Sequence, residues 1–178
     1  MNLDKFILFD PLTDRSTDLP KDNGDYIVTI RDIKNRPTCG YDIVTPLFRG
    51  HRIIYTGITS SGLRNRIGNQ HLGTNAGRST LRQSLGCLIG FPQIPRDPRK
   101  LENRMARFNE RDEAALLDWI KENLLFYYLP NPKPETLEEE LIEAFNPPLN
   151  LQKNHNPVNA EFRETLSALR RNKPWLKK

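Results

Sequence analysis

The strongest candidate for chemistry in the sequence is a glutamate on the apolar side of a predicted helix. Residues 135–145 (ETLEEELIEAF) have helical spacing, and at about 100° per residue their apolar side chains form one continuous arc. The arc consists of Leu137, Leu141, Ile142, Ala144 and Phe145. Glu138 lies inside this arc, whereas the three glutamates that follow it in the helix lie outside. The pattern therefore predicts one carboxylate that points toward the protein interior.

A carboxylate in that position is costly to bury, and two environments relieve the cost. In the first, Glu138 is a structural residue at the margin of the apolar face, paired with an arginine. In the second, its carboxylate is the ligand of a metal ion. The helical pattern alone leaves both interpretations open.

Three arginines are candidate contacts for phosphate. Arg78 and Arg82 are spaced i,i+4 near the start of a second predicted helix, and Arg64 lies in the helix before it. Side chains in such positions either contact a nucleic-acid backbone or remain solvated, and the sequence leaves both open. Ser79 and Ser84 have no base partner nearby in the sequence, so a serine hydrolase has no support.

The charge of the chain is unevenly distributed. The 178 residues carry a formal net charge of +5. Residues 24–90 hold 9 basic and 3 acidic side chains, residues 91–150 hold 8 and 12, and residues 151–178 hold 7 and 2. Two basic blocks flanking an acidic one suit a phosphate-rich partner, and a mildly basic soluble protein is the alternative.

Composition excludes several classes of protein. No apolar run approaches the ~20 residues that a membrane-spanning helix needs, and the N-terminus does not resemble a signal peptide. With 37% hydrophobic and 28% charged residues, global disorder is not expected. Cys39 and Cys87 form neither a disulfide framework nor a zinc site, which favours the reducing cytoplasm.

The elements that must position these residues form a small sheet with helices packed on it. Strands are predicted at residues 24–31, 52–58 and 124–129 from their alternating or apolar character. Long connections are expected at 32–50 and at the proline-rich 91–100. The predicted helices are 60–71, capped by Ser60 or Ser61, 80–89, capped by Ser79, and 113–123, 135–145 and 158–171. This order predicts an α/β (α+β) fold with a central, largely antiparallel three-stranded sheet flanked by helices.

Three segments together resemble the GIY-YIG nuclease superfamily. They are GDY at 24–26, YTG at 55–57 with LRNRI at 63–67, and LEEELIEAFNPPLN at 137–150. In this family a strand with GIY precedes a strand with YIG, a helix then carries an arginine, and a later helix carries a glutamate before a P-x-N turn. The resemblance implies a GIY-YIG nuclease-like fold and a nuclease function.

The resemblance assigns roles to individual residues. Tyr26 and Tyr55 correspond to the first and second motif tyrosines, of which either is the candidate general base. Arg66 corresponds to the helix arginine that clamps a phosphate oxygen. Glu138 corresponds to the glutamate that binds one divalent metal, Mg²⁺ with Mn²⁺ as a substitute, which agrees with its position on the helical wheel.

Three further residues belong to the expected site. Gly57 and Asn150 match the glycine of YIG and the asparagine that closes the motif. His71 is a candidate base or phosphate ligand, because some restriction enzymes of the family place a histidine after the helix arginine. A half-buried structural histidine is the alternative. Ile58 departs from the family, since many members carry a lysine there.

The resemblance also implies how the chain is organised and what it acts on. Residues 1–150 would form the nuclease domain, with an N-terminal extension and an insertion near 91–112. Residues 151–178 would form a basic C-terminal helix and tail packed on the same domain. We expect a metal-dependent endonuclease that cuts DNA, most simply double-stranded DNA, with RNA left open and a homodimer as one way to cut both strands. A catalytically silent nucleic-acid-binding module is the alternative, and an unrelated cytosolic α/β protein is a weaker one.

Overall fold

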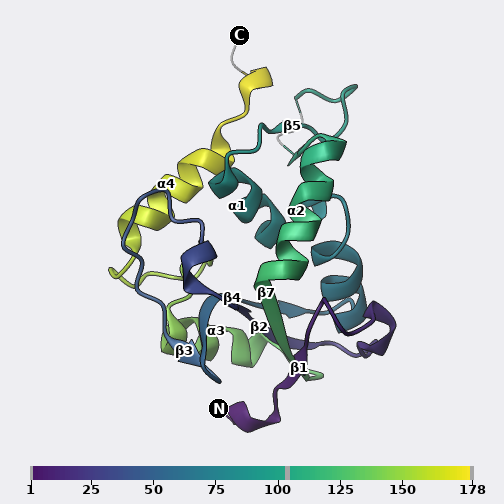
Figure 1. Cartoon of the computed structure of the whole chain (residues 1–178), viewed down its shortest axis with the longest axis vertical. Helices are drawn as coiled ribbons and strands as arrows, with labels where there is room; N and C mark the ends of the chain where they lie inside the picture. The colour runs from purple at the N-terminus through teal and green to yellow at the C-terminus, as the bar shows by residue number, and fades with distance from the viewer. Residues whose placement is uncertain (1, 103–104, 177–178) are drawn as a thin grey trace.

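The centre of the fold is an antiparallel sheet of five strands in the order β1-β7-β2-β4-β3 (Figure 1). A computed structural model describes residues 2–102 and 105–176 of the chain. The strands are β1 (Ile7–Phe9), β2 (Gly24–Ile30), β3 (Leu47–Phe48), β4 (His51–Thr59) and β7 (Leu124–Pro130). The predicted fold class and its three central strands are confirmed. The sheet is larger than predicted because of β1 and β3, whose two or three residues are too short to show an alternating pattern.

Helices cover both faces of the sheet. All seven residues of β2 are buried, since alternate side chains point to opposite faces and both faces are covered. Tyr26, Val28 and Ile30 belong to one core cluster, together with apolar residues of α1 (Thr80–Ile89), α2 (Glu110–Asn123) and α4 (Ala160–Arg171). Ile27 packs in the second core cluster, with Leu141 of α3 (Glu135–Phe145). The sheet is therefore the middle layer, with α3 on one side and the other long helices on the opposite side (Figure 1).

The helix boundaries follow the predicted caps with small shifts. The hydroxyl of Ser79 accepts a hydrogen bond from the backbone N–H of Arg82 and begins α1 as predicted. The next helix, α2, begins three residues earlier than predicted because Asn109 caps it in the same way. The last helix, α4, begins two residues later than predicted.

The remaining segments are short turns, one unusual helix and a second small sheet. The helix predicted at 60–71 begins at Arg64 and is a π-helix, η4 (Arg64–His71). Within the predicted loop 91–100, β5 (Ile94–Pro95) pairs with β6 (Ala106–Arg107). Single 3₁₀ turns are η1 (Leu3–Lys5), η2 (Ser16–Asp18), η3 (Ile33–Asn35), η5 (Ala76–Arg78) and η6 (Pro174–Leu176). Within the predicted insertion and tail, residues 103–104 and 177–178 lie outside the described residues.

Across the described part of the chain, we find no helix that is long and apolar enough to cross a membrane.

Candidate active site

Tyr26 of β2 lies at the centre of a buried polar cluster, on the face of the sheet that packs against α1, α2 and α4. Its side chain is fully buried, and its hydroxyl accepts a hydrogen bond of 3.1 Å from Nε of Arg66. The same hydroxyl is 2.9 Å from Nε2 of His71. Tyr26 is opposite Gly57 in the β2–β4 register, and a Cβ on Gly57 would lie 2.4 Å from the tyrosine hydroxyl. The glycine is therefore required for the Tyr26 ring to lie across the neighbouring strand.

The π-helix brings Arg66 and His71 to the same hydroxyl. These residues are five apart, and in an α-helix of 3.6 residues per turn they would point about 140° away from each other. In a π-helix, hydrogen bonds run from i to i+5 and the winding is wider, so residues five apart point much more nearly in the same direction. The local winding of η4 thus explains how both side chains reach Tyr26.

His71 is fully buried and linked to the start of α1. Its Nδ1 is 2.7 Å from the hydroxyl of Ser79. Burial, together with the nearby positive charges of Arg66 and Arg82, holds the pKa of His71 well below its usual value. The imidazole is therefore neutral at neutral pH. The fold thus places a base, His71, beside Ser79, which the sequence did not indicate. Ser79 is itself buried and caps α1, so it suits a positioning role rather than the role of a nucleophile.

Burial also suppresses ionisation of Tyr26. Desolvation and the neighbouring Tyr55 raise its pKa far above the ordinary value, although the charge and hydrogen bond of Arg66 act in the opposite direction. The net pKa of Arg66 is raised, because the two tyrosine hydroxyls outweigh its own desolvation. The pair at neutral pH is therefore an arginine cation beside a protonated phenol.

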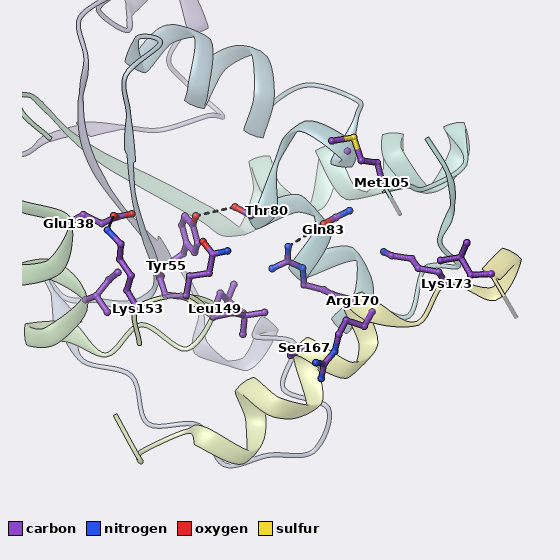
Figure 2. A pocket seen from close by; sticks show the side chains of 17 residues that line it. Tyr55, Thr80, Gln83, Met105, Glu138, Leu149, Lys153, Ser167, Arg170 and Lys173 are labelled. Atoms are coloured by element: carbon purple, nitrogen blue, oxygen red, sulfur yellow. Dashed lines mark hydrogen bonds and ion pairs between the residues drawn. The ribbon is translucent and has the colours of Figure 1, made fainter. Parts of the chain in front are cut away.

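Tyr55, unlike Tyr26, faces a cleft of about 980 Å³ (Figure 2). Its hydroxyl is 3.1 Å from the hydroxyl of Thr80, the first residue of α1. Glu138 and Asn150 line the same cleft. We call this feature the Glu138 cleft, because Glu138 lies at one end of it.

Glu138 projects from α3 into the cleft and is largely shielded from solvent. Its side chain is 19% exposed, against 73% for the neighbouring Glu139. Its Oε2 lies 2.8 Å from Nζ of Lys153, which also lies 3.4 Å from Oε1 of Glu139. The inward direction predicted from the helical wheel agrees with this exposure. The cationic partner is a lysine from a distant turn rather than the arginine that the structural interpretation expected.

Asn150 connects α3 to the strand that carries Tyr55. Its side-chain amide donates to the carbonyl of Thr56 and accepts from the backbone N–H of Thr56, both at 2.9 Å. The amide thus pairs with β4 as a neighbouring strand would. These two bonds fix the turn after α3 against β4, and with it the relative positions of Glu138 and Tyr55.

The donor set of the cleft fits a weakly held divalent cation. Among the described residues, no three His, Cys, Asp or Glu side chains form a group that could hold a metal. The carboxylate of Glu138 is a hard-oxygen ligand, which suits Mg²⁺ with most of its waters retained. The ammonium of Lys153 on Glu138 is a stand-in cation and shows that this carboxylate accepts positive charge.

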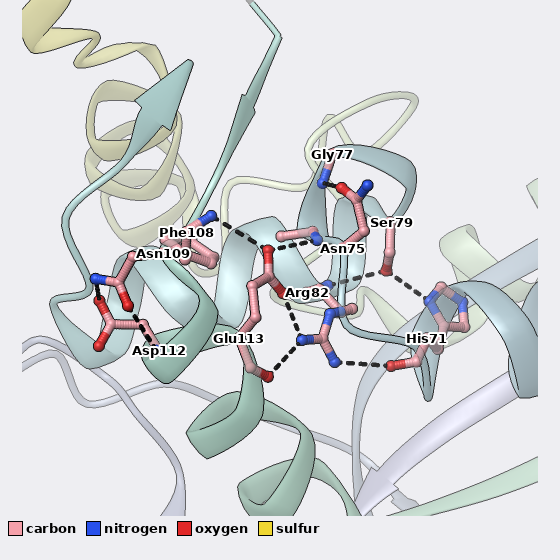
Figure 3. Close-up of polar contacts among 10 residues, drawn as sticks. His71, Asn75, Gly77, Ser79, Arg82, Phe108, Asn109, Asp112 and Glu113 are labelled. Atoms are coloured by element: carbon pink, nitrogen blue, oxygen red, sulfur yellow. Dashed lines mark hydrogen bonds and ion pairs between the residues drawn. The ribbon is translucent and has the colours of Figure 1, made fainter. Parts of the chain in front are cut away.

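Arg82 is not at the surface, and the prediction that it contacts phosphate is wrong for this conformation. Its side chain is fully buried in an ion pair with Glu113, with Nη2 2.6 Å from Oε2 (Figure 3). Its Nη1 donates to the backbone carbonyl of His71 at 3.2 Å. Glu113 also accepts from the backbone N–H groups of Ala76 and Phe108. The network therefore holds the segment between His71 and α1 in place.

The other two predicted phosphate contacts differ in their availability. Arg64 is engaged in the structure, since its guanidinium donates to the backbone carbonyls of Thr17 and Leu19 in the N-terminal segment. It stabilises that segment, so its predicted nucleic-acid contact is not supported by its position. Arg78 is exposed, and its carbonyl lies 3.4 Å from Nη1 of Arg66.

Two residues of the site escaped the sequence argument. Glu113 shares a helix face with Leu116 and Ile120, so the helical wheel that identified Glu138 would have identified it as well. No helical pattern in the sequence indicates Lys153, because this residue lies in the turn after α3 and not on a helix.

The chain was compared with known families and proteins. A family model described as the GIY-YIG catalytic domain matches residues 24–172, from the start of β2 to the end of α4. Searches of the curated proteins and of the solved structures gave no significant match.

Proposed function

Because the chain belongs to the GIY-YIG catalytic domain family, whose nuclease function implies a nucleic-acid substrate, we propose that it is a metal-dependent endonuclease that hydrolyses phosphodiester bonds in DNA. One observation carries the proposal. Tyr55, Glu138 and Asn150 line a single cleft, and Arg66 lies behind them on the Tyr26 hydroxyl. This combination places a carboxylate and a phenol on the wall of the cleft and a guanidinium behind them.

In the proposed site Glu138 holds the metal, Mg²⁺ with Mn²⁺ as a substitute. Lewis-acid activation of the scissile phosphate is the chemistry that such an ion supplies when bound. Lys153 must first leave the carboxylate, and its exposed position in the cleft allows it to turn toward a phosphate oxygen. Asn150 keeps the turn in place while this exchange occurs.

Tyr55 is the better candidate for the general base. It lines the cleft, whereas the hydroxyl of Tyr26 is buried and shared by Arg66 and His71. The raised pKa of Tyr26 also opposes loss of its proton. We therefore assign the general base to Tyr55, which must first release its own hydroxyl proton to solvent and then, as phenolate, accepts a proton from the attacking water, with Thr80 orienting its oxygen.

Arg66, Tyr26 and His71 then act together behind the cleft. The positive charge of Arg66 stabilises negative charge that develops on the phosphate and on the oxygen of Tyr55. Tyr26 holds the guanidinium through its Nε, and neutral His71 holds Tyr26 through Nε2. Tyr26 and His71 are therefore positioning residues in this proposal.

The proposal includes a location and an assembly. Cys39 and Cys87 are both free thiols, which supports a reducing compartment such as the cytoplasm. A chain with one such site cuts both strands of a duplex most simply as a homodimer. Sedimentation with and without duplex DNA tests the assembly.

Cleavage of nucleic acid by the purified full chain tests the function. Supercoiled plasmid, linear duplex and single-stranded RNA are incubated in Mg²⁺, in Mn²⁺ and in EDTA. Metal-dependent nicking or linearisation of the plasmid supports the proposal, and cutting confined to RNA would reassign the substrate. Binding of DNA without cutting in either metal would favour the catalytically silent module.

A further inference from the structure

The Glu138 cleft continues beyond the catalytic residues to the C-terminal end of α4. There its wall includes the side chains of Arg170 and Lys173, while Glu138 and Lys153 lie at the other end (Figure 2). Tyr55 and Leu149 lie between the two ends. The cleft is therefore elongated, with cationic side chains at both ends.

Arg170 and Lys173 are shielded from solvent, and their hydrogen-bond partners among the described residues are neutral. Lys173 is 9% exposed, and Arg170 is partly buried. Arg170 Nη2 donates to Oε1 of Gln83 at 3.2 Å, and Lys173 Nζ donates to Oε1 of Gln93. None of the ion pairs found between described residues includes either cation.

Cys87, which acts electrostatically on both cations, does not supply the missing negative charge. Cys87 lies close enough to interact electrostatically with both cations, but burial raises the pKa of its thiol to about 11. The thiol is therefore neutral at physiological pH. Burial lowers the pKa of Arg170 and of Lys173, as expected for cations that lack a counter-ion.

Arg82 is a contrasting buried cation, because a carboxylate neutralises it. Its guanidinium is fully buried, and Nη2 lies 2.6 Å from Oε2 of Glu113. Gln83 and Gln93 place amides where carboxylates of nearly the same shape would neutralise Arg170 and Lys173. A shielded cation that opens onto a cleft and has no counter-ion is favourable for an anion that enters from outside.

We propose that Arg170 and Lys173 form a second phosphate-binding site, which holds the backbone of the DNA strand beside the bond that is cut. The proposal rests on the proposed nuclease function for the identity of the ligand. The planar guanidinium of Arg170 suits two oxygens of one phosphate, and Lys173 adds a point charge. The two glutamines hold both side chains in place without cancelling their charge.

Binding measured without metal tests the site separately from cutting. Fluorescence anisotropy of a labelled DNA duplex in EDTA compares wild type with Arg170→Met and Lys173→Met over a range of salt. Each variant should weaken binding roughly threefold or more and lower the salt slope by about 1. Lys34→Met is the matched control, because Lys34 is exposed and lies outside the cleft lining.

A further variant, at Gln83, neutralises the charge of Arg170 and leaves the Arg170 side chain in place. Gln83→Glu places a carboxylate beside Arg170 and should weaken DNA binding as Arg170→Met does, while thermal melting shows that the chain remains folded. Binding at the wild-type level in all three cleft variants would overturn the proposal. If that result accompanied metal-dependent plasmid cleavage by the wild type, the nuclease function would still stand. Weakened binding in a protein that never cuts would retain the phosphate site and remove the nuclease function.

Discussion

The ammonium of Lys153 lies 2.8 Å from Oε2 of Glu138, the carboxylate that is the proposed metal ligand. Lys153 has a left-handed backbone conformation with a φ of 60°, which is uncommon for a residue other than glycine. The next residue, Asn154, is buried and donates to the carbonyl of Pro147 at 3.1 Å. The lysine is thus held against Glu138 by the folded turn that follows α3.

The first prediction concerns this contact. Lys153→Met should tighten binding of Mg²⁺ or Mn²⁺ roughly 2- to 5-fold, because the metal no longer competes with an ammonium for Glu138. Calorimetry or Mn²⁺ electron paramagnetic resonance measures the affinity without any cleavage, and Glu138→Gln serves as the variant without a site. Weaker metal binding in Lys153→Met would show that the lysine does not compete with the ion.

The second prediction separates the two tyrosines. Tyr55→Phe should lower the single-turnover cleavage rate about 10²- to 10⁴-fold, since it removes the proposed base. Tyr26→Phe should lower stability by about 1–3 kcal/mol, because Arg66 and His71 lose a buried partner. Cleavage rates and melting curves are measured for both variants. A stable, inactive Tyr26→Phe beside an active Tyr55→Phe would exchange the two roles.

The third prediction concerns Gly57, which lies opposite Tyr26 on the neighbouring strand. In Gly57→Ala the new Cβ would lie 2.4 Å from the Tyr26 hydroxyl and 2.6 Å from its Cζ, so the ring must move. We expect a loss of about 1–3 kcal/mol in stability and a loss of cleavage, because Arg66 is displaced with the ring. Urea unfolding and plasmid cleavage measure the two effects. Wild-type behaviour in both assays would mean that the ring position is not critical.

The fourth prediction follows from a buried aspartate in β2. The pKa of Asp25 is raised to about 6, chiefly by burial; the hydrogen bond from Asn131 acts to lower it, and the charges of Glu138 and Glu135 act to raise it. A folded pKa above the unfolded value of 3.8 means that stability falls as pH rises from about 4 to about 6 and then stays low.

Asp25→Asn should therefore stabilise the protein by about 1–3 kcal/mol at pH 8 and have little effect at pH 4. Unfolding by urea at both pH values measures the difference. Asp118→Asn is the control, because Asp118 lies on the exposed side of α2. An equal effect of Asp25→Asn at the two pH values would contradict the raised pKa.

Local patterns in the sequence predicted the central strands and the direction of Glu138. The strands containing Tyr26 and Tyr55 show the alternation or apolar character of buried strands, and the wheel of α3 has one acidic residue in its apolar arc. These features depend on a few neighbouring residues. They could therefore be predicted from the sequence without knowing the fold.

The remaining features depend on contacts between distant segments. Arg82 was predicted at the surface from its i,i+4 spacing to Arg78. Its ion-pair partner, Glu113, is 31 residues away in the sequence, so that spacing could not indicate the pair. No residue pattern in 64–71 predicted the π-winding of η4, so the common approach of Arg66 and His71 to Tyr26 was not predicted. Helical spacing also gives no indication of a residue such as Lys153, which acts from a turn.

The most direct test of the account compares two neighbouring glutamates of α3. Glu138→Gln and Glu139→Gln make the same chemical change on the same helix, but only Glu138 is shielded and lines the cleft. Cleavage of supercoiled plasmid in Mg²⁺ is measured for both variants and for wild type, with melting curves to confirm folding. We expect Glu138→Gln to abolish cleavage and Glu139→Gln to retain it. Cleavage at the wild-type rate by a folded Glu138→Gln protein would contradict the proposed active site.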